Sequence, residues 1–261
     1  MTVNSTELKS TETVVQQSFL FRSCSSDALA QALEDAVPLS EKLYSNRPIY
    51  TAYRPGNALQ FLYLIVGGGP VIVRSSPLDR IIAIHYPGSC FGEGSLPVGF
   101  GPISHAFPSL VEAYKTTDVL KVPVSVVEHL YASDAGFRDR YNLLLELREK
   151  FQYHLLNCST YPPQAVASLF RALIYQEREL GNQPDESSTY TFDLPIDIIA
   201  HASQLNHRTV EQVLKGMEQQ NLIETARSSD LSGDTIRVLN AEGMKEVYST
   251  TRDKVSWWPL K

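Results

Sequence analysis

Cysteine is scarce in this chain of 261 residues, and its three cysteines, Cys24, Cys90 and Cys158, are widely spaced. An odd, scattered set predicts reduced thiols in a cytoplasmic protein and excludes a disulfide framework. Long hydrophobic runs are also lacking, since no apolar stretch reaches the ~18 residues that a membrane helix needs. The first fifteen residues carry one Lys and two Glu without an apolar segment, which is not the pattern of a secretory signal.

An excess of positive charge is missing as well. The formal net charge of -6 argues against a protein that coats nucleic acid, although it does not exclude a sequence-specific contact. Between residues 194 and 227 three basic residues (Arg208, Lys215, Arg227) meet four acidic ones (Asp197, Glu211, Glu218, Glu224). We therefore expect modest non-specific affinity for nucleic acid and a shallow salt dependence.

What the sequence does contain is a first half rich in short β-branched and aromatic runs. Residues 1–18 are polar and predicted to be mobile. An amphipathic helix follows from Ser26-Asp27 to Val37, and residues 39–44 are expected to add another helical turn. From Arg47 onward, Gly- and Pro-rich turns separate apolar runs at 49–50, 61–66, 71–73, 81–84 and 119–122. This pattern predicts a jelly roll or β-sandwich, with an unrelated β-domain that binds no ligand as the alternative.

A long amphipathic helix is predicted next. Apolar residues recur at spacings of three and four along about six turns: Phe137, Tyr141, Leu144, Leu145, Phe151, Leu155 and Cys158. Such a seam is suited to a parallel coiled-coil dimer. The alternative is a helix that packs only on its own β-domain. Tyr161-Pro162-Pro163 breaks this helix and is expected to form a hinge to a second domain.

Two short helical patterns joined by a turn lie between residues 195 and 217. The first carries Ile196, Ile199, Ala200 and Ala202, and the second carries Val210, Val213, Leu214 and Met217. Asn206 is placed to cap the second helix by accepting a hydrogen bond from the backbone N–H of Arg208 or Thr209. The pattern predicts a helix-turn-helix.

The outward residues of the second helix suit base recognition. Arg208 can bind guanine with two hydrogen bonds, Gln212 can do the same for adenine, and Thr209 can reach a phosphate. The predicted DNA-binding set is Asn206, His207, Arg208, Thr209, Gln212 and Lys215. The alternative is an ordinary helix pair with a solvated face.

A predicted strand at residues 190–194 precedes this motif, and a predicted hairpin from residues 222–224 and 235–239 follows it. A helix-turn-helix with such a hairpin is winged, and Arg227, Ser228 and Ser229 at its tip are placed to touch phosphate. A last helix is expected at residues 241–248. Trp257-Trp258-Pro259 forms a tail that should cover something apolar.

The chain resembles the Crp/Fnr transcription regulators. Ile199-Ala200, Thr209-Val210, Val213-Leu214 and Asn221-Leu222-Ile223 are similar to the DNA-binding end of that family. Upstream, Tyr53-Arg54-Pro55-Gly56, residues 62–68 and residues 86–93 are similar to its cyclic-nucleotide-binding fold. The sequence departs from well-known members at Gln204, where glycine is usual, and at His207-Arg208, which replace an Arg-Glu pair. A different operator sequence is therefore expected.

The resemblance implies an α+β chain with five parts. These are a mobile N-terminus (1–18), a jelly-roll effector-type domain (19–132), a dimerisation helix (133–160), a winged helix-turn-helix domain (161–250) and a tail (251–261). It further implies a homodimer that binds double-stranded DNA at a palindromic operator and contacts RNA polymerase. The alternative function is a ligand-responsive interaction module whose winged domain docks a protein partner.

The resemblance also points to an effector site. Gly92, Glu93 and Gly94 match the start of the family's phosphate cassette, in which an arginine about ten residues on neutralises the phosphate. No arginine lies between Gly94 and Lys115, Phe107-Pro108 stand where Arg-Ser is expected, and His105 is largely neutral. A buried phosphodiester without a cation is costly, which argues against cyclic AMP or GMP. Gln152 and Tyr153 on the long helix are further candidates for contact with an unidentified effector.

Cofactor and enzyme chemistry find little support. One cysteine near the N-terminus cannot hold an iron–sulfur cluster. His85 and Cys90 are five residues apart and are expected to be a satisfied strand histidine and a buried thiol, not haem ligands. The sequence has no Ser/His/Asp arrangement, metal-ligand spacing or P-loop. We expect neither an enzyme nor a bound cofactor or metal.

Overall fold

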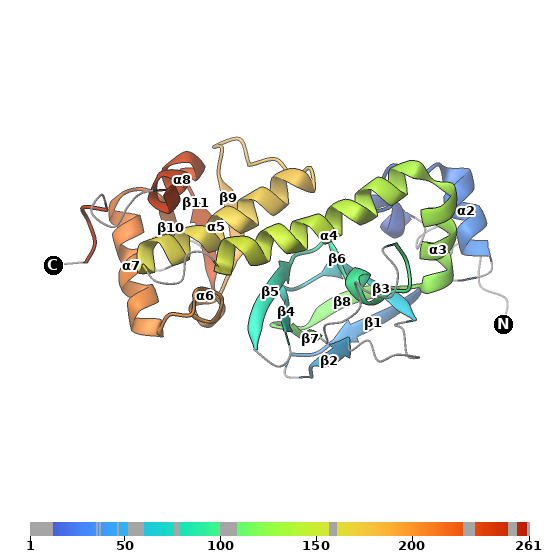
Figure 1. Cartoon of the computed structure of the whole chain (residues 1–261), viewed down its shortest axis with the longest axis horizontal. Helices are drawn as coiled ribbons and strands as arrows, with labels where there is room; N and C mark the ends of the chain where they lie inside the picture. The colour runs from blue at the N-terminus through green and yellow to red at the C-terminus, as the bar shows by residue number, and fades with distance from the viewer. Residues whose placement is uncertain are drawn as a thin grey trace. The chain divides into compact units, whose positions relative to one another are not determined.

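The computed structural model of the chain describes residues 13–34, 36, 38–45, 47–51, 60–75, 79–99, 109–156, 161–226, 233–249 and 255–259. The chain divides into two compact units, Met1–Arg148 and Glu149–Lys261. Among the described residues, no helix is long and apolar enough to cross a membrane. Figure 1 labels the helices and strands of both units.

The first unit is built on two four-stranded antiparallel sheets. One has the strand order β1-β8-β3-β6, from Leu39–Leu43, Thr117–Pro123, Phe61–Gly67 and Cys90–Phe91. The other has the order β2-β7-β4-β5, from Ile49–Thr51, Ser109–Ala113, Val71–Ser75 and Arg80–His85. Both sheets contribute to one apolar core, in which the Tyr63 and Phe91 rings stack with centroids 4.8 Å apart. Two antiparallel sheets around one core are the arrangement that the predicted jelly roll or β-sandwich requires.

Helices α2 (Ser26–Glu34), α3 (Val124–Ser133) and α4 (Ala135–Leu156) complete the first unit, and α4 continues into the second. Helix α2 packs on α3. The Phe21, Phe137, Tyr141 and Tyr131 rings form a chain of aromatic contacts with centroid distances of 5.2, 6.2 and 5.5 Å. These ring contacts pack the N-terminal half of α4 against α3 and the segment around Phe21.

Two local predictions for the first unit differ from the structure, and one helix was missed. Residues 39–43 form strand β1 and not a helical turn, because their backbone pairs with residues 117–121 of β8. Residues 13–17 are helical and Val15 is fully buried, within a segment expected to be mobile up to residue 18. Helix α3 was not predicted, although its buried residues Val126, Val127 and Leu130 have helical spacing.

The second unit contains the predicted winged motif. Helix α5 (Pro162–Glu179) contacts α6 (Ile196–Ser203), α7 (His207–Gln219) and α8 (Ala241–Ser249). A three-stranded antiparallel sheet has the order β10-β11-β9, from Ile223–Thr225, Thr235–Val238 and Tyr190–Asp193. Pro162 and Pro163 stand in the first turn of α5 and so begin a helix. Proline is tolerated there because the first helical N–H groups have no partner within the helix.

Candidate nucleic-acid interface

The turn between α6 and α7 is closed by a left-handed residue. Gln204 has φ 55° and ψ 36°, and the backbone N–H groups of Gln204 and Leu205 both donate to the carbonyl of Ala200. The left-handed conformation costs a non-glycine residue about 1 kcal/mol. Gln204 thus adopts the left-handed conformation that glycine takes most readily.

Helix α7 begins at the predicted cap. The Asn206 side-chain Oδ1 accepts a hydrogen bond from the Thr209 backbone N–H at 2.9 Å. The cap fixes where the first turn of α7 starts and therefore the direction in which its exposed side chains leave the backbone. Asn206 itself keeps its side-chain amide N–H groups available as donors.

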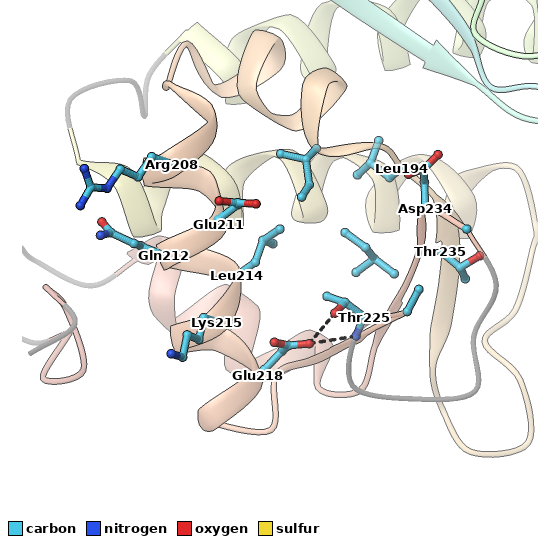
Figure 2. Close-up of a pocket in the computed structure, with 14 residues that line it drawn as sticks. Leu194, Arg208, Glu211, Gln212, Leu214, Lys215, Glu218, Thr225, Asp234 and Thr235 are labelled. Carbon is cyan, nitrogen blue, oxygen red and sulfur yellow. Dashed lines mark hydrogen bonds between the residues drawn. The ribbon is translucent and has the colours of Figure 1, made fainter.

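Helix α7 has one apolar and one polar face. Val210, Val213, Leu214 and Met217 are at most 5% exposed and anchor the helix in the core of the unit. Arg208, Gln212 and Lys215 are exposed and point outward in one row (Figure 2). We call these three residues the outward row. A spacing of four and then three residues places them on one side of the helix, as the sequence predicted.

His207 precedes the outward row and touches the preceding helix. Its Nε2 lies 3.2 Å from Asp197 Oδ1, and both side chains are more than 60% exposed. Such a pair in solvent contributes little to stability. A ligand that approached the start of α7 would compete with Asp197 for this imidazole.

The predicted hairpin lies beside α7. Ile223–Thr225 pairs with Ile236–Val238, and Arg237 Nη1 meets Glu224 Oε2 at 3.0 Å across the two strands. Glu218 of α7 accepts two hydrogen bonds from Thr225, one from its hydroxyl at 2.6 Å and one from its backbone N–H at 3.2 Å. These bonds tie α7 to the base of the hairpin. The predicted tip residues, Arg227, Ser228 and Ser229, lie outside the described residues.

A cavity of about 560 Å³ opens between α7 and the hairpin. Figure 2 shows Glu211, Leu214 and Glu218 directed toward it, and the outward row lies at its rim. Three carboxylates, those of Glu211, Glu218 and Asp234, line it together with the cations Arg208 and Lys215. The cavity walls thus have no positive excess, as expected from the charge count.

The first unit holds a second group of polar residues at the predicted cassette. Glu93 is 4% exposed, and its Oε1 lies 3.9 Å from Arg148 Nη1 of α4. The Tyr141 hydroxyl donates to the Glu93 backbone carbonyl at 2.7 Å. Burial raises the pKa of the Glu93 carboxyl, and the nearby Arg148 charge offsets only part of that rise. Within the described part of the chain, Glu93 Oε2 has no hydrogen-bond partner.

Arg148 is the cation that the sequence analysis did not find. Its guanidinium lies so close to Gly94 that a side-chain carbon at that position would collide with Nη1. Glycine at residue 94 therefore lets the arginine reach the cassette. Sequence spacing gave no sign of this contact, because Arg148 comes from a helix far along the chain. The stretch that holds His105, Phe107 and Pro108 lies outside the described residues.

His85 and Cys90 lie at the ends of β5 and β6 and are both buried. His85 Nδ1 is 3.3 Å from the Ser89 hydroxyl, which matches the expected satisfied strand histidine. Burial lowers the pKa of His85 to about 3, with a smaller contribution from the Arg148 charge. Burial also raises the pKa of the Cys90 thiol. Both groups are therefore neutral at physiological pH.

Four residues of the predicted apolar seam of α4 are buried within one chain. Phe137, Tyr141, Leu144 and Phe151 are at most 8% exposed. A dimer contact therefore cannot use these side chains unless they leave their own core. The remaining effector candidates differ in exposure, since Gln152 is half-buried and Tyr153 is 64% exposed.

Comparison with solved structures finds this fold at low sequence identity. FixK2 from Bradyrhizobium japonicum is 19% identical, with a TM-score of 0.58 over 82% of this chain and 99% of that one. A CooA mutant from Carboxydothermus hydrogenoformans is 14% identical, with a TM-score of 0.56 over 84% and 90%. A Eubacterium rectale protein assigned to the Crp/Fnr family of transcriptional regulators is 14% identical, with a TM-score of 0.51 over 88% and 98%.

Neither a family model nor a curated protein matches the sequence. The structural likeness spans nearly the full length of the three solved proteins. The chain therefore has the fold of the Crp/Fnr regulators, and the predicted α+β architecture of β-roll and helix-turn-helix is confirmed.

Proposed function

We propose that this protein is a sequence-specific DNA-binding transcription regulator. The observation that carries the proposal is the outward row Arg208, Gln212 and Lys215, exposed on a capped helix of a winged helix-turn-helix. The anchored apolar face of α7 leaves these side chains as the part of the helix that can enter a major groove. The shared fold with a Crp/Fnr-family regulator adds support.

Each residue of the predicted set has a role in this proposal. Arg208 reads guanine through O6 and N7, and Gln212 reads adenine through N6 and N7. Thr209 and Lys215 contact backbone phosphates, which position the helix without reading sequence. Asn206 and His207 stand at the end of α7 nearest the bases, and His207 exchanges Asp197 for a DNA acceptor. RNA polymerase is the protein partner expected of such a regulator.

The regulator is proposed to act as a homodimer on a palindromic operator. Two copies of α7 would then enter successive major grooves, with half-site centres ~34 Å apart. Because four residues of the apolar seam of α4 are buried, the contact between copies is proposed to use the more exposed residues of this helix. Leu145 of the seam, Gln152 and Leu156 lie seven and four residues apart along a more exposed side, where Leu156 is 55% exposed. That stripe is the proposed dimer contact.

Control by cyclic AMP is not part of the proposal. In the cassette Gly92, Glu93 and Gly94, the carboxylate is buried and already faces a cation of its own chain. A nucleotide hydroxyl would have to compete with that arrangement. The proposed effector is of other chemistry, with Gln152 and Tyr153 among its contacts.

The test begins with selection of DNA by the full-length protein. A random duplex pool is bound, recovered and sequenced, and affinity for the enriched site is measured by fluorescence anisotropy at fixed salt. We expect a palindrome with half-sites one helical turn apart. Arg208→Ala should weaken binding to that site about ten- to hundredfold and relax the preference at one base pair.

Lys245→Ala is the matched control, because Lys245 is an exposed cation of a different helix, α8, of the same unit. It removes the same charge and should change affinity by less than about twofold. The proposal fails if the wild-type protein enriches no sequence over the starting pool. Recovery of a bound protein instead, with binding that survives loss of His207, Arg208 and Gln212, would favour the interaction-module alternative.

A further inference from the structure

Gly216 is an unexpected residue in the middle of α7. The helix runs from His207 to Gln219, and Gly216 is buried with helical backbone angles. Glycine in a helix interior is less favourable than alanine because it loses more backbone freedom on folding. No feature of the backbone requires glycine here, so the reason must lie in what packs against it.

The C-terminal tail packs against this glycine. A side-chain carbon on Gly216 would lie 2.6 Å from Cζ3 of Trp257 and would also collide with Cε3. Trp257 is half-buried, Val255 is 5% exposed, and the Trp258 backbone N–H donates to the Val255 carbonyl at 3.1 Å. Figure 1 shows this tail, in red, beside α7. Only glycine lets the indole ring lie directly on the helix backbone.

The tail contact and the hairpin contact hold opposite sides of α7. Gly216 and Glu218 are about 160° apart around the helix, because successive residues turn by about 100°. The outward residues Gln212 and Lys215 lie on the arc between them. Glu218 bonds Thr225 on one side, and Trp257 covers Gly216 on the other. Gln212 is four residues before Gly216, so the indole lies on the flank next to this predicted base-reading side chain.

We infer that Trp257 is a positioning residue for DNA recognition, and that the tail Val255–Pro259 holds α7 in the orientation that binding needs. By closing the flank at Gly216, the indole fixes the tilt of α7 and limits the directions open to Gln212. This inference rests on the proposed function. Its prediction is that operator affinity depends on a segment that itself touches no base.

The test is a set of full-length variants: Trp257→Ala, Gly216→Ala, the double variant, and Trp257→Phe. Affinity is measured for the enriched palindrome and for a scrambled duplex. Trp257→Ala should lose about tenfold on the palindrome with little loss on scrambled DNA. Trp257→Phe should keep most of the affinity, because a ring still covers the glycine.

Gly216→Ala should lower affinity for the palindrome only while the Trp257 indole is present. We expect it to lose about tenfold in the wild-type background and to be neutral or favourable beside Trp257→Ala, where the collision is gone and alanine is the better helix former. Trp258→Ala removes a neighbouring indole from the same tail and should lower affinity for the palindrome less than Trp257→Ala does. A purely structural role would lower binding to both duplexes alike by reducing the folded fraction.

Two failures can be told apart. If the wild-type protein does not distinguish the palindrome from scrambled DNA, the proposed function is wrong. If it does, but Trp257→Ala binds as well as wild type, or the two substitutions act additively, then the tail does not position α7 and this inference is overturned.

Discussion

The two units use their polar residues in opposite ways. In the β-roll unit, His85 and Glu93 are buried, and burial moves the pKa of each toward its neutral form. In the second unit, Arg208, Gln212 and Lys215 are exposed. The first arrangement is completed by the chain's own side chains, such as Arg148 and Ser89. The second presents its donors to solvent, as the proposed DNA contact on α7 requires.

The largest expected effect on stability comes from His85. The unfolded chain binds a proton here below its ordinary pKa of 6.5, whereas the folded chain does so only near about 3. Stability is therefore lost as pH falls from 6.5 toward 3, by about 2 kcal/mol at pH 5. His85→Gln should remove that loss, which urea unfolding at pH 7.5 and pH 5 would measure.

The raised pKa of Glu93 acts in the other direction, since the folded chain holds this proton at higher pH than the unfolded chain. The stabilisation that this proton gives the folded chain declines as pH rises above 4.5. It is the same in wild type and His85→Gln, so it cancels when the two are compared. His129→Gln is the control, because His129 is exposed in the same unit. If His129→Gln removes as much acid sensitivity as His85→Gln, the contrast between buried and exposed groups is wrong.

A smaller effect is expected at the start of α7. Asn206→Ala removes the side-chain acceptor of the Thr209 N–H and should destabilise the second unit by about 1 kcal/mol. Asn206→Ser keeps an acceptor oxygen and should cost much less. Both tryptophans of the chain are in the tail, so tryptophan fluorescence during unfolding follows this unit. Equal midpoints for the alanine and serine variants would show that the cap is not used.

The smallest effect is expected from cyclic AMP. Because the Glu93 carboxylate already faces Arg148, 1 mM nucleotide should leave the thermal midpoint unchanged. A ligand with a dissociation constant of ~10 μM would stabilise the folded state by about 2.7 kcal/mol at that concentration, which is several degrees for a domain of this size. A midpoint raised by that amount would mean that the cassette opens to nucleotide and that the two units are more alike than proposed.

Local patterns predicted most of the fold but not its distant contacts. The cap at Asn206, the apolar face of α7 and the hairpin are short-range features with characteristic residue types. Strand β1 was missed because LSEKL has no apolar alternation, and only pairing with β8 makes it a strand. The contacts of Arg148 with Glu93 and of Trp257 with Gly216 join residues far apart in sequence. The glycines at 94 and 216 were their only local signs.

The two prolines that begin α5 limit how a signal can pass along the chain. A proline inside a helix loses a hydrogen bond and its ring collides with the carbonyl four residues earlier. Helices α4 and α5 therefore cannot fuse into one continuous rod across Pro162 and Pro163. In the proposed regulator, a signal carried by straight extension of α4 into α5 would cost about 3 kcal/mol at these prolines.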